Sequence, residues 1–141
     1  MKQAFCLVLS LLLNAVAPGV ATAGEGSSTR RGYDRATIYF VGWDVLTRSR
    51  LSIEDVKRSA PIVVQIRRRA EASKFAQSLH LDEMTAVTPP TEEDKRLVIE
   101  LLRVGGGVEV YYANARALLS SDSTRSRVVD AEFRKRFEIV Q

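Results

Sequence analysis

The sequence predicts one α+β domain, in which helices pack on one face of a mostly antiparallel sheet in the order β-α-β-α-β-β-α. Three observations lead to this prediction. The chain has 141 residues, the size of one domain. Its apolar content of 45% is enough for a core and too high for a disordered chain. Apolar residues alternate in some segments and recur every three to four positions in others. We expect residues 37–141 to form this domain.

The first 23 residues have the pattern of a secretory signal peptide. A lysine precedes the apolar run 4–17, Pro18-Gly19 then breaks any helix, and small residues lead up to Ala23. We expect cleavage between Ala23 and Gly24, which predicts a periplasmic or secreted protein. The apolar run is shorter than the roughly 20 residues of a spanning helix, so we expect no stable membrane anchor after cleavage.

A flexible leader is expected at residues 24–36, because this segment is polar, glycine-rich and without a period. The clearest strand follows at Thr37–Val45. Alternation places Tyr39 and Trp43 on one face of this strand and Phe40 on the other. Large apolar groups on both faces indicate an interior strand that is covered on both sides.

A short helix, a second strand and a second helix are predicted next. Ser52 and Asp55 have the spacing of a helix-capping pair, and Pro61 disfavours helix at the residue before it. The apolar run Ile62–Ile66 reads as a strand. A second helix follows, because four apolar residues recur there with helical spacing: Ala72, Phe75, Ala76 and Leu79.

Residues 91–104 allow two interpretations. An acidic first turn after a threonine and a glycine at the end favour a helix. Alternating apolar residues instead favour a strand that turns through Gly105–Gly107 into a second strand at residues 108–112. We favour the hairpin, because a helix would leave the second strand without an antiparallel neighbour.

The C-terminal part of the chain is expected to hold one extended segment, one loop and one helix. Ala117–Leu119 is predicted to be extended, and residues 120–127 to be a polar loop. Asp130 is expected to cap a closing helix. Phe133 and Phe137 lie one turn apart in this helix and are predicted to face the core.

The residues needed for several kinds of chemistry are missing from the sequence. Its only histidine is His80, and its only cysteine lies within the predicted signal peptide. No spacing typical of a zinc site, a nucleophile elbow or a nucleotide-binding loop is present. We therefore predict no cofactor, no metal and no enzymatic activity. His80 beside Asp82 and Glu83 is interpreted as a helix-end contact and not as an acid–base pair.

Arginine dominates the basic residues, accounting for sixteen of the twenty-one in a chain of net charge +4. Its planar fork of donors pairs well with carboxylates, so the runs of arginine are candidate contacts for an acidic partner. Alternation puts Tyr111 and Tyr112 on opposite faces, one in the core and one exposed. The predicted partner-binding residues are Arg67, Arg68, Arg69, Tyr111, Tyr112 and Arg116.

These observations predict an exported protein-binding module of the bacterial envelope, for example an inhibitor or immunity-type protein, that binds a protein partner through a sheet edge or an arginine- and tyrosine-bearing face. Two alternatives stay open. A hydrolase of envelope glycans would need two acids in one cleft, and the candidates are Asp44, Glu100 and Glu109. A binder of an anionic envelope polymer would show strongly salt-dependent affinity. No nucleic-acid partner is expected.

Overall fold

Seven antiparallel strands form one sheet in the computed structural model, which describes residues 32–90 and 93–138. The predicted signal peptide and most of the predicted leader lie outside these residues. Three α-helices and one 3-10 turn complete a mixed α+β domain. The elements in chain order are β1 (Tyr33–Phe40), α1 (Ile53–Ser59), β2 (Ile62–Ile66), α2 (Arg69–Ser78), η1 (Leu81–Glu83), β3 (Thr85–Ala86), β4 (Leu97–Arg103), β5 (Val108–Ala113), β6 (Ala117–Ser120), β7 (Arg125–Val128) and α3 (Ala131–Glu138).

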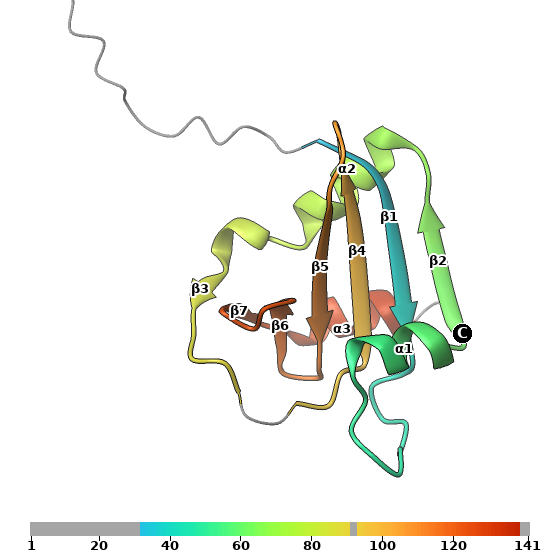
Figure 1. The fold of residues 1–141 in the computed structure, drawn as a ribbon, viewed down its shortest axis with the longest axis vertical. Helices are drawn as coiled ribbons and strands as arrows, with labels where there is room; N and C mark the ends of the chain where they lie inside the picture. The colour runs from blue at the N-terminus through green and yellow to red at the C-terminus, as the bar shows by residue number, and fades with distance from the viewer. Residues whose placement is uncertain (1–31, 91–92, 139–141) are drawn as a thin grey trace, which may run out of the picture.

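The strands follow one another across the sheet in the order β2-β1-β4-β5-β6-β7-β3 (Figure 1). The central pair joins distant parts of the chain, with Thr37 of β1 opposite Glu100 of β4. Strands β4 and β5 form the predicted hairpin, which confirms the strand interpretation of the segment that ends at Arg103. The turn of this hairpin needs a positive φ at Gly105, Gly106 and Gly107, and glycine adopts this conformation without strain.

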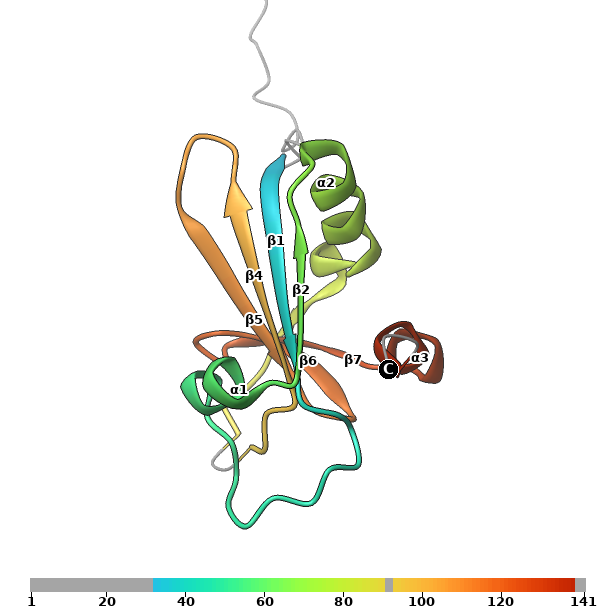
Figure 2. The ribbon, with the colours of Figure 1, turned by 90° about the vertical axis from the view of Figure 1, so that its right-hand side faces the viewer.

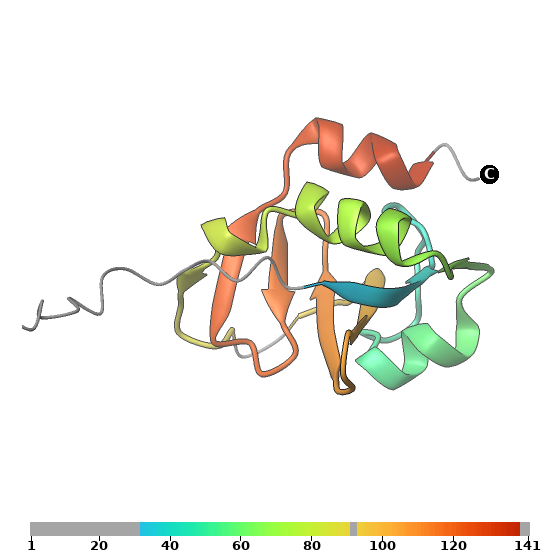
Figure 3. The same ribbon diagram turned by 90° about the horizontal axis from the view of Figure 1, so that it is seen from above.

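Helices cover both faces of the sheet, which corrects the prediction that they pack on one face. The larger core lies on the side of α2 and α3 and includes Phe40, Ile99 and Phe133. A smaller core lies on the side of α1, where Val56 packs with Tyr112. Figure 2 and Figure 3 show α1 on one side of the sheet and the other two helices opposite it. Amphipathic spacing predicts that a helix has a buried side, but not which sheet face it meets.

The first strand begins and ends earlier than predicted. It begins at Tyr33, within the segment expected to be a leader, and ends at Phe40. Gly42 then turns the chain with a φ of +114°, which breaks the alternation expected up to Val45. Trp43 therefore packs in the larger core beside Phe40, with ring centroids 5.0 Å apart, and not on the face of Tyr39.

Two predicted helix starts are confirmed. Ser52 and Asp55 form a reciprocal capping box at α1. The Phe133 amide donates to Asp130 Oδ1 over 2.6 Å at the start of α3, and Phe133 and Phe137 are buried as expected. The predicted loop at residues 120–127 is wrong in its last part, because β7 begins at Arg125. Within the described residues, we find no helix long and apolar enough to cross a membrane.

Candidate functional site

The predicted arginine run lies at the junction of β2 and α2. Arg67, Arg68 and Arg69 are all exposed. Arg67 Nη2 donates to the Gln65 side chain over 3.0 Å, whereas the other two contact acids within 3.4 Å, Glu71 for Arg68 and Asp34 for Arg69. The Arg67 guanidinium therefore lies beside the end of β2 and is held there by a neutral group, which leaves its charge available to a ligand.

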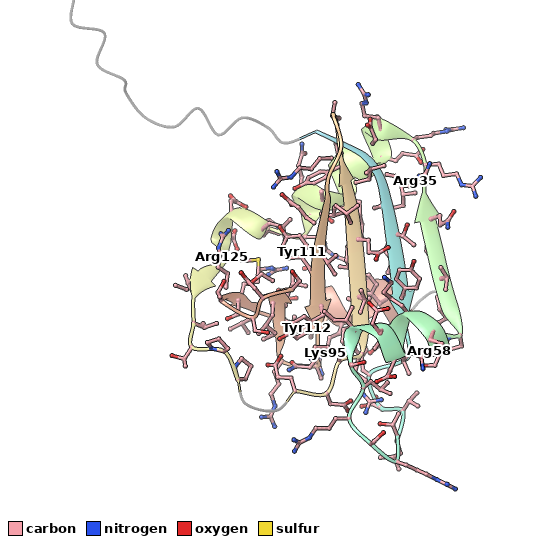
Figure 4. All side chains as sticks on the ribbon, in the orientation of Figure 1. Arg35, Arg58, Lys95, Tyr111, Tyr112 and Arg125 are labelled. Atoms are coloured by element: carbon pink, nitrogen blue, oxygen red, sulfur yellow. The ribbon has the colours of Figure 1, made fainter. Side chains whose placement is uncertain are left out.

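The two tyrosines lie on opposite faces of β5, as predicted, but neither is an exposed anchor. Tyr112 is 1% exposed in the smaller core, where its hydroxyl lies 2.6 Å from Ser123 Oγ. Burial raises the pKa of Tyr112 to about 12. Tyr111 is half-buried on the other face, and its hydroxyl donates to Glu109 over 3.0 Å. Figure 4 shows both side chains on β5, away from the β2 edge.

Arg116 is exposed in the turn between β5 and β6. Because β2 and β4 both run antiparallel to β1, and β5 runs antiparallel to β4, this turn and the arginine run lie at opposite ends of the sheet. The structure thus brings Arg67, Arg68 and Arg69 together and separates them from Arg116.

The three candidate acids do not share a cleft. Asp44 is exposed in the loop after β1. Glu100 lies on the α1 side of the sheet, where its Oε1 is 2.8 Å from Lys57 Nζ and holds the pKa of this lysine above its usual value. Glu109 lies on the opposite side, where Arg103 Nε donates to it over 2.6 Å. Two carboxylates on opposite faces of a sheet cannot act on one glycosidic bond.

His80 is exposed in a left-handed conformation after α2, and its Nδ1 lies 3.2 Å from Glu83 Oε1. The interpretation from sequence, a contact of His80 with the helix end, is therefore wrong in its partner, because the imidazole contacts the carboxylate of Glu83. In the part of the chain that the structure describes, no group of three acids, histidines or cysteines could hold a metal ion.

Strand β2 forms a long edge of the sheet. The Val41 amide continues the ladder from β1 to β4 by donating to the Arg96 carbonyl over 3.0 Å. Hydrogen bonding alternates along a strand, so the even-numbered residues of β1 bond to β2. Their partners on β2 are Ile62, Val64 and Ile66. The backbone N–H and C=O groups of Val63 and Gln65 consequently point away from the sheet, and no described strand lies alongside them.

An apolar pocket opens beside this edge on the larger-core side. It has a volume of about 250 Å³ and lies between α2, α3 and the strands β1 and β2. Figure 2 looks onto the β2 edge and shows α2 and α3 on the same side of it. The lining residues are mostly apolar: Ile38, Phe40, Ile62, Val64, Phe75, Ser78, Arg136 and Phe137.

Positive charge surrounds the β2 edge. From Lys57 to Arg69 the chain has five cationic side chains and no acidic one, and three of the five contact acids of other segments: Lys57, Arg68 and Arg69. Arg58 lies beside the start of β2 (Figure 4), and its side chain is 78% exposed with an acid no closer than 3.9 Å. Arg67 lies beside the other end of the strand. An extended ligand along β2 would therefore meet a cation at each end.

Reasoning from sequence found the arginines but missed the edge itself. Pro61 precedes β2 directly, and a proline at the start of a strand is typical of edge strands, because it cannot donate to a ladder. Helical spacing predicted that Phe137 of α3 is buried, but it did not indicate a pocket beside β2, because α3 and β2 meet only through the tertiary fold.

Comparison of the chain with protein-family models, with curated proteins and with solved structures finds no match.

Proposed function

We propose that this chain is an exported, non-enzymatic protein-binding module that binds its partner by strand addition at the β2 edge. Strand addition uses main-chain hydrogen bonds for affinity and pockets beside the edge for specificity. Export rests on the signal-peptide pattern of the first 23 residues. A periplasmic or secreted inhibitor or immunity-type protein would act in this way, by occupying a segment of its target.

The observation that carries the proposal is the outward backbone of Val63 and Gln65. Each residue offers one donor and one acceptor along an edge of five residues. The other edge of the sheet, β3, has two residues. Natural proteins shorten, cover or charge their edge strands to prevent unwanted pairing, so a longer apolar edge is a candidate contact surface.

The alternative functions have less support in the geometry. A glycan hydrolase needs two carboxylates about 5–9 Å apart across a substrate, but Glu100 and Glu109 lie on opposite faces of the sheet. A polymer-binding surface would use many unpaired cations, whereas Arg68 and Arg69 contact acids of the same chain.

The experiment compares two substitutions at one position. Val63→Pro removes the outward backbone N–H. Val63→Thr keeps this N–H and replaces the valine side chain by one of similar shape. Immobilised wild-type protein, V63P and V63T are exposed to envelope extract of the source cells, and the retained proteins are identified by mass spectrometry. We expect a protein that the wild type and V63T retain and that V63P loses.

The folding of each variant is checked first by urea unfolding. Proline is tolerated at an edge position whose N–H faces solvent, so V63P should keep a cooperative transition. Gln65→Pro, at the other outward amide, provides a second test in case V63P is unstable. A protein retained equally by the wild type and both proline variants would contradict the proposal.

A further inference from the structure

We infer that the segment bound at β2 is an extended, acidic one with a large apolar side chain, which enters the pocket between α2 and α3. The inference rests on the proposed function, because it specifies the ligand of the same edge. Three features meet at this place: the outward backbone of Val63 and Gln65, the pocket beside β2, and cations at both ends of the strand.

The position of the pocket follows the alternation of side chains in a sheet. A strand added to β2 would lie about 4.8 Å from it, and residues directly opposite each other point to the same face. Ile62 and Val64 point to the α2 side and line the pocket. A ligand residue opposite Val64 therefore projects its side chain over the pocket, and its two neighbours project to the other face.

The pocket suits an apolar side chain in both size and chemistry. A volume of about 250 Å³ exceeds the roughly 150 Å³ of an apolar protein cavity that binds benzene, so an aromatic ring fits. The polar groups of the lining already have intramolecular contacts: the Ser78 hydroxyl donates to the Phe75 carbonyl over 2.6 Å, and Arg136 Nη1 donates to the Ser78 carbonyl over 3.1 Å. A polar side chain would gain little there and would lose its hydration.

The positive charge at both ends of β2 favours an acidic ligand and disfavours pairing with a second copy of the chain. Arg58 precedes β2, and Arg67 follows it. Acidic residues that flank the apolar side chain would meet these guanidinium groups at either end of the edge. Two β2 strands paired antiparallel would instead bring Arg58 of each copy next to Arg67 of the other. Like charges placed opposite each other disfavour this pairing.

The probe is a dye-labelled peptide, Asp-Glu-Val-Thr-Phe-Thr-Val-Glu-Asp, titrated with the full-length protein and followed by fluorescence anisotropy. Its side-chain order is the same in both directions, so the test does not depend on strand orientation. We expect saturable binding that weakens about tenfold or more when Phe is replaced by Ala, the effect of removing a buried aromatic ring. Replacing the four acids by their amides is expected to weaken binding by a similar factor at low salt.

Variants of the protein locate each contribution. Ser78→Leu fills the pocket, so it should weaken binding of the Phe peptide to the level of the Ala peptide and leave the Ala peptide unaffected. The substitution Arg67→Gln removes the guanidinium that only a neutral side chain contacts, so it should weaken the preference for acids. Arg116→Gln, with the same charge change at the other end of the sheet, is the matched control and should leave that preference in place.

The outcomes separate the inference from the proposed function. Equal affinity for the Phe and Ala peptides, with binding still lost in V63P, would overturn the pocket ligand and leave strand addition standing. Binding of the Phe peptide that V63P does not change would contradict strand addition itself. No saturable binding up to about 1 mM would overturn the inferred ligand, and extract capture would still test the proposed function. A dimer seen by sedimentation in wild type and absent in V63P would show that a second copy occupies the edge, which also overturns the inference.

Discussion

Replacing Glu109 by glutamine should cost the fold about 2–3 kcal/mol at neutral pH, because this carboxylate is a buried acceptor. Its side chain is 12% exposed and accepts hydrogen bonds from the Tyr33 hydroxyl at 2.8 Å, the Tyr111 hydroxyl at 3.0 Å and Arg103 Nε at 2.6 Å. A hydrogen bond to a charged group contributes about 1.5–3 kcal/mol. The Arg103 side chain is 44% exposed and can be hydrated after the change, so the ion pair itself adds little.

The stabilisation by Glu109 should depend on pH and should decrease in acid. Burial alone would raise the pKa of Glu109, but hydrogen bonds from Tyr33, Arg103 and Tyr111 outweigh it and hold the pKa below its usual value near 4.5. The folded state therefore favours the ionised form. The resulting stabilisation is complete above the usual pKa and is lost as pH falls through the lower pKa of the folded state. Glutamine does not titrate, so the gap between wild type and variant should narrow as pH falls below the usual pKa of about 4.5.

Urea unfolding followed by tryptophan fluorescence measures the gap, because Trp43 is 8% exposed in the larger core. Glu100→Gln is the matched control on the other face of the sheet. Its partner Lys57 is 30% exposed, so the expected loss is only about 0.5–1 kcal/mol. Equal stability of wild type and E109Q at pH 7, or a gap that widens in acid, would refute the reasoning.

Three further predictions concern single positions. Asp130→Ala removes the cap on the Phe133 amide and should lower the free energy of unfolding by about 1 kcal/mol in urea titrations; an unchanged midpoint would contradict the capping role. Gly42→Ala should destabilise the protein by about 1–3 kcal/mol in the same assay, because φ is +114° and the added methyl would lie 2.8 Å from Val45 Cγ2. Tyr112 should ionise with a pKa of about 12, seen as the difference in ultraviolet absorbance between wild type and Tyr112→Phe; ionisation near pH 10 would show that its hydroxyl is solvated.

Local rules predicted the parts of the fold that local interactions determine. The Ser52–Asp55 pair marks the start of α1 because both groups lie within one turn of chain. The hairpin of β4 and β5 follows from alternation and a glycine turn. Pairing between distant segments was not predictable in the same way. Arg125–Val128 has little apolar alternation, and it becomes a strand because β6 and β3 lie on either side of it.

The sequence predicted the arginines of the candidate site but neither the β2 edge nor the pocket. A run of three arginines is visible in any reading of the sequence, and it lies at one end of the exposed edge. The pocket was not predictable, because Phe75 and Phe137 come from two helices that are far apart in the chain and meet only over the folded sheet. Tyr112 was grouped with the contact residues because alternation assigns opposite faces without indicating that α1 would cover one of them.

The unequal lengths of the two outer strands limit how many molecules can assemble. A sheet open on both sides can lengthen from copy to copy into a fibre, whereas this one offers five residues on one side and two on the other. If a partner adds a strand at β2 as proposed, the short β3 offers no comparable second edge, so the complex should have one-to-one stoichiometry and should not polymerise at high concentration.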